Sequence, residues 1–560
     1  MAAISDSKAP LEHADVEMLS SSENSSDLDD SYEVFKKAEG LEYDESEAKK
    51  VLRKIDMRIV PVLFMTYLLQ YLDKNAINYS SVYGLKQGTH LHGDQYSWLN
   101  SIFYFGYLVA QYPSGYIMQR FPIGKFLSLI TFGWGLILIT TPACYNFAGI
   151  AVNRFMLGLV EAAINPGFVL VMGLWYTSAE QPLRLEAYYC TNGLATMVGG
   201  LIGYAIGHIT TGTLARWQYV FIIFGAVSIA WAAISFLLLP DLPSTAKFLT
   251  ERERAIAVHR VAKNRQGVKN THFKKDQAWQ CLADPKTWIL FIMAVGAQVP
   301  NSALTSVSTL SIHLYSAALF SRYLFYSPVF LLLFRPLPCS PLPCLLQILL
   351  TNAPQFTSII IKTFGYDTLG TQYLQIPGGF VQFAALLGGG IVCTKFPNSR
   401  CITMIVANLI CILGAALLVG LPDSNKWGRL VALWLCYFQG LGFSMSLTMV
   451  SSNVSGYTKK QLTGAAIFTG YCVGNIIGPQ TFRDSEAPGY HSAYIAMLVG
   501  YVVKLLSVVA LYAYMWSVNK KRDREAAAAG PLTEEQKREA VELGMKDLTE
   551  IDNKGFRYTL

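Results

Sequence analysis

Long apolar segments separated by short polar ones run through most of the chain. Each segment is about as long as a helix needs to cross some 30 Å of hydrocarbon. About twelve can be delimited, near 59–85, 96–118, 125–143, 148–174, 186–209, 218–239, 287–306, 369–394, 401–421, 428–452, 461–482 and 491–516. The pattern predicts an all-α membrane protein with about twelve transmembrane helices.

The polar segments divide these spans into two groups of six. The short links "RFPIGK" (Arg120 to Lys125) and "KFPNSR" (Lys395 to Arg400) stand at corresponding places in the two groups, which favours a duplicated bundle. We expect an acidic, disordered tail over 1–50, an N-terminal six-helix bundle over 51–239, a central loop over 240–286, a C-terminal bundle over 287–516 and a second tail over 517–560.

Basic residues gather in alternate connections. They precede the first span, follow the second and fourth, fill the central loop and recur after the eighth, tenth and twelfth. Lys and Arg favour the cytoplasmic side of a membrane protein. The distribution therefore predicts that both termini and the central loop are cytoplasmic.

Composition supports a membrane protein and argues against several other classes. The chain of 560 residues is 52% hydrophobic and only 15% charged, whereas soluble domains carry about 25% charged residues. Its net charge of +7 comes largely from the short loops, so we expect a lipid bilayer and no nucleic acid as partner. The ten cysteines show neither a CxxC pair nor metal-ligand spacing. With no hydrolase or metalloprotease motif in a suitable context, we expect no enzyme activity, no metal and no cofactor.

Four ionisable residues lie within predicted spans of the first half. Asp73 and Lys74 are adjacent in the first span, and Arg154 and Glu161 share one face of the fourth, about 10.5 Å apart along the axis. A charge at the centre of a membrane helix costs about 2.5–3.5 kcal/mol on insertion scales, so such residues are functional candidates. Paired charges also lock helices together, and Lys74 or Arg154 near a helix end would reach the interface.

This set provides the minimum for moving an anion together with a proton. A carboxylate in a cavity of low dielectric can carry a proton, and a nearby cation gives an anionic substrate a place to bind. Weaker substrate-binding candidates are the neutral polar residues Asn192, Gln375 and Asn475. Such side chains often only join one helix to another by a hydrogen bond.

Five motifs carry a resemblance to a known family. They are "YLDKNAINY", "RFMLGLVEA", "LPDLPSTAKFLTERER", "TLGTQYLQIPGG" and "GYCVGNIIGPQTF". Together they resemble the anion:cation symporter branch of the major facilitator superfamily and, more narrowly, the fungal allantoate permease group. The resemblance extends from about residue 45 to the end. It implies two pseudo-repeated six-helix bundles, alternating access and proton-coupled uptake of a small organic acid at the plasma membrane, by a monomer.

The resemblance also implies roles for individual residues. Asp73 and Glu161 match the proton-coupling acids, and Arg154 matches an arginine that influences protonation of the glutamate. Lys74 stands where the branch usually has an arginine that binds the substrate carboxylate, and lysine offers a point charge in place of a bidentate fork. Gln119 stands near the place of a loop aspartate, so no charge relay is expected there.

The identity of the carboxylate stays open at this point. Allantoate and ureidosuccinate fit a carboxylate-binding pocket, and so do nicotinate, pantothenate and small dipeptides. A nutrient sensor built on a transporter fold would carry similar helices. Accumulation of labelled substrate separates a permease from a sensor.

One segment, residues 307–355, does not fit the pattern. It contains "RPLPCSPLP", has no helical periodicity and has no counterpart in the family pattern. Its removal joins "NSALTS" to "FTSIIIKTFGYDTLGTQYLQIPGG" and restores the expected approach to the eighth span. Codons for its ends allow splice sites, and we interpret the segment as a translated intron that interrupts the seventh span irregularly. The alternatives are a genuine insertion or an extra apolar hairpin.

Overall fold

The computed structural model describes residues 43–92, 95–207, 213–262, 272–305, 374–422, 424–481, 491–529, 547–553 and 555–560. Every regular element in these ranges is a helix. The segment 307–355 and the N-terminal tail up to residue 42 lie outside the described residues, so their interpretations stay predictions.

Within the described ranges, twelve helical segments correspond to the predicted spans, although α3 begins before the predicted 59 and α25 continues beyond the predicted 516. Those of the first half are α3 (Glu45–Val82), α5 (Gln95–Arg120), α6 (Ile123–Thr140), α7 (Phe147–Glu161) with α8 (Ile164–Trp175), α9 (Gln181–Tyr189) with α10 (Thr191–Gly207), and α11 (Arg216–Leu238). Those of the second half are α14 (Pro285–Thr305), α20 (Gln375–Lys395), α21 (Arg400–Gly420), α22 (Lys426–Cys436) with α23 (Gln439–Asn453), α24 (Tyr457–Gln480) and α25 (His491–Ala529). Shorter helices connect them: α4 (Leu85–Gly88), η2 (Thr141–Ala143), α12 (Glu251–Ala262) and α13 (Lys275–Ala283).

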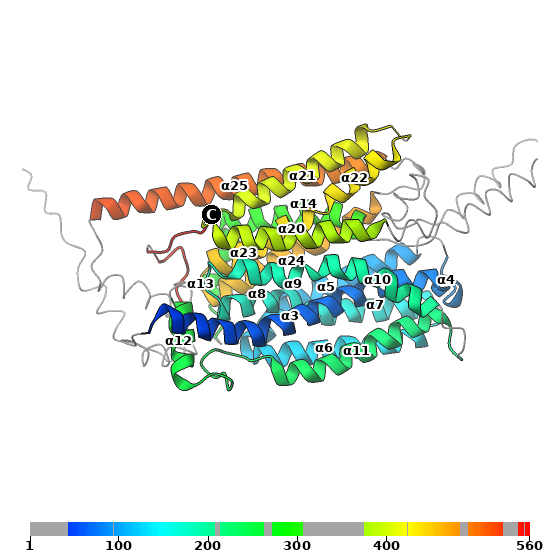
Figure 1. Ribbon diagram of the computed structural model, residues 1–560, viewed down its shortest axis with the longest axis horizontal. Coiled ribbons are helices and arrows are strands. Elements are labelled where there is room, and N and C mark those ends of the chain that lie inside the picture. Colours follow the sequence, from blue (N-terminus) through cyan, green and yellow to red (C-terminus); the bar gives the residue numbers. More distant parts are fainter. Residues whose placement is uncertain are drawn as a thin grey trace, which may run out of the picture.

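Equivalent helices pack in the same way in the two halves. The third and sixth spans, α6 and α11, form one outer pair, and the ninth and twelfth, α21 and α25, form the other. Likewise α3 packs against α10 and α11 as α14 packs against α24 and α25. Figure 1 shows the two outer pairs at opposite edges, with α5, α9, α10, α20 and α24 between them. The fold is that of two pseudo-repeated six-helix bundles.

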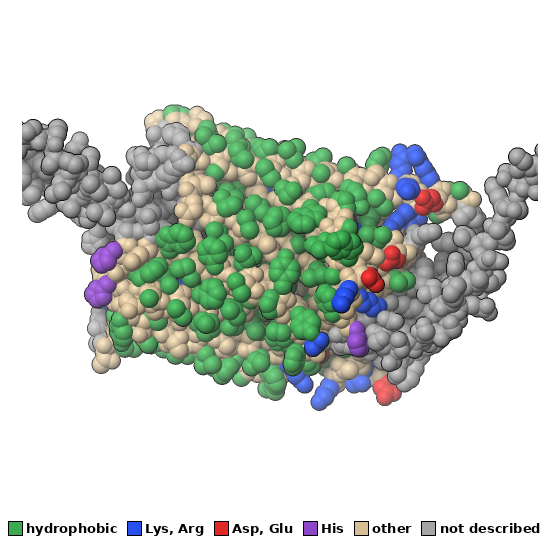
Figure 2. Space-filling view, turned by 180° about the vertical axis from the view of Figure 1, so that it is seen from behind, with side chains coloured by type: hydrophobic (Ala, Val, Ile, Leu, Met, Phe, Trp, Pro, Cys, Tyr) green, Lys and Arg blue, Asp and Glu red, His purple; other side chains and the backbone are tan. Residues whose placement is uncertain are grey.

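The outer helices present apolar side chains to their surroundings. Leu129 on α6, Ile234 on α11, Leu413 on α21 and Leu506 on α25 are all exposed. Figure 2 shows apolar side chains over most of the visible face and the charged ones gathered mainly toward one end. By length and composition, eight of the described helical segments qualify as membrane spans. The remaining spans, such as α5 and α24, which pack on each other, are less apolar.

Ion pairs join the central loop to the first half at one end of the molecule. We call the end where α3 begins and where residues 547–553 and 555–560 lie the tail end. There, Lys54 of α3 pairs with Glu253 of α12 at 2.5 Å, and Arg260 of α12 pairs with Glu180 at 2.5 Å. The central loop, through α12, is thus tied to the first half at the tail end.

Candidate functional site

A cavity of about 60 Å³ lies between the two halves. Since one water needs about 10–15 Å³ by this kind of measure, the cavity holds only a few waters. It combines one lysine and one glutamate with carboxamide and phenol groups: Tyr67, Gln70, Tyr71, Lys74, Tyr107, Glu161, Asn165, Tyr189 and Asn192 from the first half, and Gln298, Asn301, Gln382, Gln439 and Tyr471 from the second. We call it the central cavity.

Lys74 reaches across the central cavity from α3 to the second half. Its Nζ donates a hydrogen bond of 2.7 Å to the Oη of Tyr471 on α24. The ammonium also lies 5.0 Å from the ring centre of Tyr104 and 5.3 Å from that of Tyr471, within the range of cation–π attraction. Within the described part of the chain, no carboxylate lies within 4.0 Å of this ammonium, so its charge is available to an anion.

Glu161 enters the central cavity where the fourth span is interrupted. It is the last residue of α7, and α8 begins three residues later. Pro166 has no N–H to bond to the carbonyl of Ala162, and Gln111 on α5 donates to that carbonyl instead, at 3.2 Å. The Glu161 side chain is buried, and its Oε2 accepts a 3.4 Å hydrogen bond from Gln70. Its Oε1 has no partner among the described residues.

Several carboxamides around the central cavity also keep an oxygen without a partner among the described residues. These oxygens are Oδ1 of Asn165 and Asn192 and Oε1 of Gln382 and Gln439. A buried polar group that makes no hydrogen bond costs about 1–3 kcal/mol. Hydrogen-bond donors on a bound molecule would remove that cost. The site therefore suits an anion that also carries N–H groups.

Asp73 and Arg154, the other two charged candidates, do not line the central cavity. Adjacent residues of a helix point about 100° apart, so Lys74 faces the cavity while Asp73 faces α6 and α11. Asp73 Oδ2 accepts hydrogen bonds from Trp134 Nε1 at 2.8 Å and Ser228 Oγ at 2.7 Å. Arg154, two turns from Glu161, is buried with its guanidinium 5.4 Å from the ring centre of Phe221. Neither side chain faces lipid.

The neutral candidates have different outcomes. Asn192 lines the cavity as expected. Asn475 does not, but its Nδ2 donates to Oε1 of the lining residue Gln298 at 3.2 Å. Gln375 is the first residue of α20, and its side chain lies outside what the structure describes.

The sequence reasoning missed most of the cavity's neutral lining. Gln298 and Asn301 are three residues apart on α14, so they share one helix face, and Gln439 donates to Asn301 at 2.5 Å. The sequence feature that could have predicted them is a pair of side-chain amides at helical spacing within an apolar span. That signal is weaker than a charge, because uncharged polar residues cost less in a membrane.

No group of three or more His, Cys, Asp or Glu residues in the described ranges is arranged to hold a metal ion. The polar lining of the central cavity consists of one lysine, one glutamate, tyrosines and carboxamides.

Comparison with known proteins gives a consistent result. The family model described as Major Facilitator Superfamily matches residues 63–479. An uncharacterised transporter of Schizosaccharomyces pombe is 33% identical over 92% of this chain and 88% of its own length. Allantoate permease of Saccharomyces cerevisiae is 29% identical over 95% of this chain and 90% of its own. Among solved structures, the proton:xylose symporter XylE superposes with a TM-score of 0.59 at 11% identity, over 85% of this chain and 96% of that one.

Proposed function

The chain belongs to the major facilitator superfamily, and we propose on this premise that it takes up a small organic anion together with protons by alternating access. Transport by a multi-pass membrane protein follows from the family. The anion and the proton are our inference. We propose the plasma membrane as its location, with both termini and the tail end on the cytoplasmic side, because Lys and Arg gather in the connections at that end.

The observation that carries the proposal is the placement of Lys74 and Glu161 in one cavity between the halves. A site at the interface of two repeats can face either side of the membrane in turn. Lys74 supplies the positive charge that a carboxylate needs, and the phenol of Tyr471 beside it orients that charge. Glu161 supplies a carboxyl group that can exist with or without a proton.

The two groups couple anion and proton through electrostatics. A substrate carboxylate held by Lys74 would repel an ionised Glu161 in the same low-dielectric cavity. Uptake of a proton by Glu161 removes that repulsion, so substrate and proton enter together. In this proposal Asp73 does not carry the proton. It holds α3 against α6 and α11 through Trp134 and Ser228.

The proposed substrate is a ureido acid of the allantoate or ureidosuccinate kind. The unpartnered oxygens of Asn165, Asn192, Gln382 and Gln439 favour a ligand that donates several N–H bonds beside its carboxylate. Allantoate permease is among the relatives of similar length. The cavity is too small for such a molecule in the closed arrangement described here, so binding requires the halves to move apart.

The test is uptake in a yeast strain lacking its own permeases for these compounds. Labelled allantoate, ureidosuccinate, nicotinate, pantothenate and a dipeptide are offered at several external pH values. We expect accumulation of the ureido acids, stronger at acid external pH. A sensor would bind without accumulating, and accumulation of nicotinate or pantothenate alone would exclude the ureido-acid assignment.

The role of Glu161 is tested by Glu161→Gln. This variant should lose accumulation against a gradient while still exchanging internal for external substrate. Glu186 is the matched comparison, because it is also fully buried and accepts a 2.6 Å hydrogen bond from Ser444 across the two halves but does not line the central cavity. If Glu161→Gln still accumulates substrate and Glu186→Gln does not, the proton carrier has been misassigned.

A further inference from the structure

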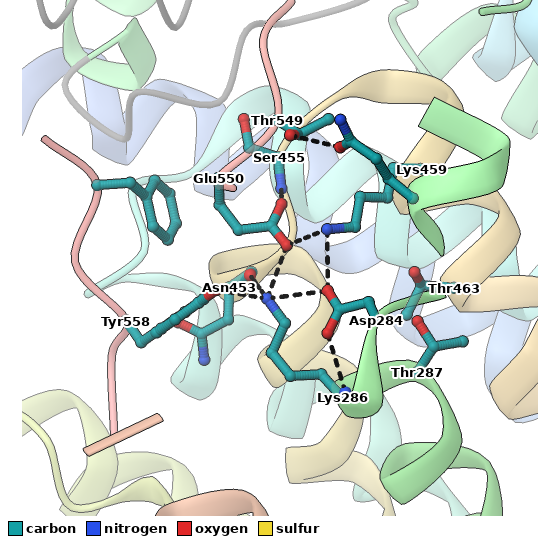
Figure 3. Close-up of polar contacts among 12 residues, drawn as sticks. Asp284, Lys286, Thr287, Asn453, Ser455, Lys459, Thr463, Thr549, Glu550 and Tyr558 are labelled. Atoms are coloured by element: carbon teal, nitrogen blue, oxygen red, sulfur yellow. Dashed lines mark hydrogen bonds and ion pairs between the residues drawn. The ribbon is translucent and has the colours of Figure 1, made fainter. Parts of the chain in front are cut away.

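The C-terminal residues 547–553 and 555–560, which we call the C-terminal segment, lie against the tail end of the second half. Figure 3 shows Glu550 of this segment pointing between Lys286 and Lys459. Lys286 is the second residue of α14, and Lys459 is the third residue of α24. The segment thus contacts the starts of two different spans.

Four charged side chains form a closed cluster at this place. Glu550 Oε1 lies 2.6 Å from Lys286 Nζ and also pairs with Lys459. Asp284 Oδ2 lies 2.9 Å from Lys459 Nζ and 3.4 Å from Lys286 Nζ. All four side chains are at most 2% exposed. Two positive and two negative charges therefore balance only while Glu550 is in place, and removing one partner of a buried pair leaves an uncompensated charge.

Two asparagine side chains also form hydrogen bonds with the backbone of the C-terminal segment. Asn453 donates to the carbonyl of Thr559 at 2.8 Å and accepts from its N–H at 2.7 Å. Asn519 on α25 makes the same two-bond pairing with Tyr558, at 2.8 and 2.9 Å. Two carboxamides placed to pair with successive residues constitute a built binding site for an extended peptide.

The residues that anchor the segment adjoin the residues that join the two halves. Ser451 and Ser452 each donate a 2.7 Å hydrogen bond to Oε1 of Gln181 in the first half, and the anchor Asn453 follows directly. Thr458, which receives a 3.4 Å hydrogen bond from Gln119 in the first half, directly precedes the anchor Lys459.

Arg400 both binds the C-terminal segment and contacts the first half. Its backbone N–H donates to the carbonyl of Leu560 at 3.1 Å. Its side chain donates to the carbonyl of Ser178 in the first half. The C-terminal segment therefore holds in place the second-half residues that contact the first half at the tail end.

We propose that the C-terminal segment is a releasable clamp, which occupies this site while the tail end is closed and leaves it when the two halves part there. Lys286 and Lys459 share one oxygen of Glu550, so any shift of the start of α14 against the start of α24 that accompanies this opening breaks at least one ion pair. Docking of the segment and closure of the tail end are then two linked equilibria, and each favours the other. This inference needs transport by alternating access but not a particular substrate.

The test uses the full chain with Glu550→Gln. Hydrogen exchange of the C-terminal segment reports docking, and disulfide formation between Gln181→Cys and Ser451→Cys reports closure of the tail end. We expect amides of the segment to exchange about tenfold to hundredfold faster, the effect of losing a charge-assisted hydrogen bond. We also expect the disulfide yield to fall severalfold.

The matched control is Glu525→Gln, because Glu525 is an exposed glutamate on α25 whose ion pair with Lys521 spans 4.0 Å at the surface. A second variant, Asn519→Ala, removes the pairing with Tyr558 without leaving a buried charge, so it serves if Glu550→Gln fails to fold. Unchanged protection of the segment in both variants would refute the clamp. Faster exchange with a disulfide yield equal to that of the control would also refute it, since the segment would then be a static anchor. Neither readout requires the substrate proposal to be right.

Discussion

The contact between α5 and α7 gives a sharp prediction, because two glycines interlock there. A Cβ on Gly106 would overlap the carbonyl oxygen of Phe155 and lie 3.1 Å from the nitrogen of Leu159. A Cβ on Gly158 would overlap the carbonyl oxygen of Phe103 and lie 3.0 Å from the nitrogen of Tyr107. At each glycine, the backbone of the opposite helix therefore occupies the space that a Cβ would need. The obstructing atoms are backbone, which no rotamer change can move.

The cost of filling either position follows from this geometry. Gly106→Ala or Gly158→Ala must part the helices, and overpacking of this kind costs about 1–3 kcal/mol, occasionally more. For a bundle of this size we expect the melting temperature to fall by about 2–12 °C. Transport should fall as well, because Gly158 lies one turn before Glu161, and Phe103 and Tyr107 line the cavity from α5.

The matched control is Gly115→Ala on α5, where a Cβ would have no atom within 4 Å. It gains the same helix propensity, about 1 kcal/mol, without the clash. Thermal unfolding of purified variants gives the comparison, and the double variant Gly106→Ala/Gly158→Ala should lose less than the sum of the two, since one displacement accommodates both methyl groups. If the melting temperature of either single variant equals that of Gly115→Ala, α5 and α7 do not pack as closely as proposed.

Three further predictions concern single side chains. Lys74→Met should raise the KM for uptake about tenfold or more, the effect of losing one hydrogen bond to a charged group, and Lys74→Arg should recover part of it; an unchanged KM would remove Lys74 from the substrate. Asp73→Asn should transport normally, because an amide oxygen still accepts from Trp134 and Ser228, and loss of proton-driven accumulation would return Asp73 to the coupling mechanism. Burial by itself raises the pKa of Glu550, but the charges of Lys286 and Lys459 outweigh it and hold the pKa below its usual 4.5. Its contribution to docking is therefore complete above 4.5 and is lost as the pH falls through the lowered pKa, so the difference in hydrogen exchange of the C-terminal segment between the unmodified protein and Glu550→Gln, corrected for intrinsic rates, should be equal at pH 7 and about pH 5.

The fold was predictable from the sequence because the membrane imposes one strong rule on helix length and polarity. The predicted spans agree with α3 to α25 within a few residues at most boundaries, for example 96–118 against Gln95–Arg120 and 401–421 against Arg400–Gly420. Breaks within three spans were not predicted. The one between α7 and α8 depends on Pro166 and on Gln111, which is fifty residues away and satisfies the carbonyl that Pro166 cannot.

The site was only partly predictable, because cost in the membrane does not say which way a side chain points. Asp73 and Lys74 carry equal weight as intramembrane charges, yet only Lys74 faces the cavity. Glu161 and Asn192 line the cavity, and Gln298 and Tyr471 join them from the second half only through the packing of the two halves. The docking of residues 547–560 was not predicted either. Its sequence contains one glutamate and a few polar residues, as any charged tail does. The site that binds it forms only when folding brings Lys286 and Lys459 together.

Helices α14 and α24 contribute both to the central cavity and to the sites that bind the C-terminal segment. On α14, Lys286 and Gln298 are separated by 12 residues, and on α24, Lys459 and Tyr471 are separated by 12 as well. Both distances correspond to about 18 Å of helix, so the two sites lie at matching depths on neighbouring helices. Any displacement of Tyr471 relative to Gln298 that accompanies opening of the cavity therefore also moves Lys459 relative to Lys286, unless the helices bend. Coupling of this kind is reciprocal. A substrate that draws Tyr471 toward Lys74 should raise the equilibrium constant for docking of the C-terminal segment by the same factor by which a docked segment strengthens substrate binding.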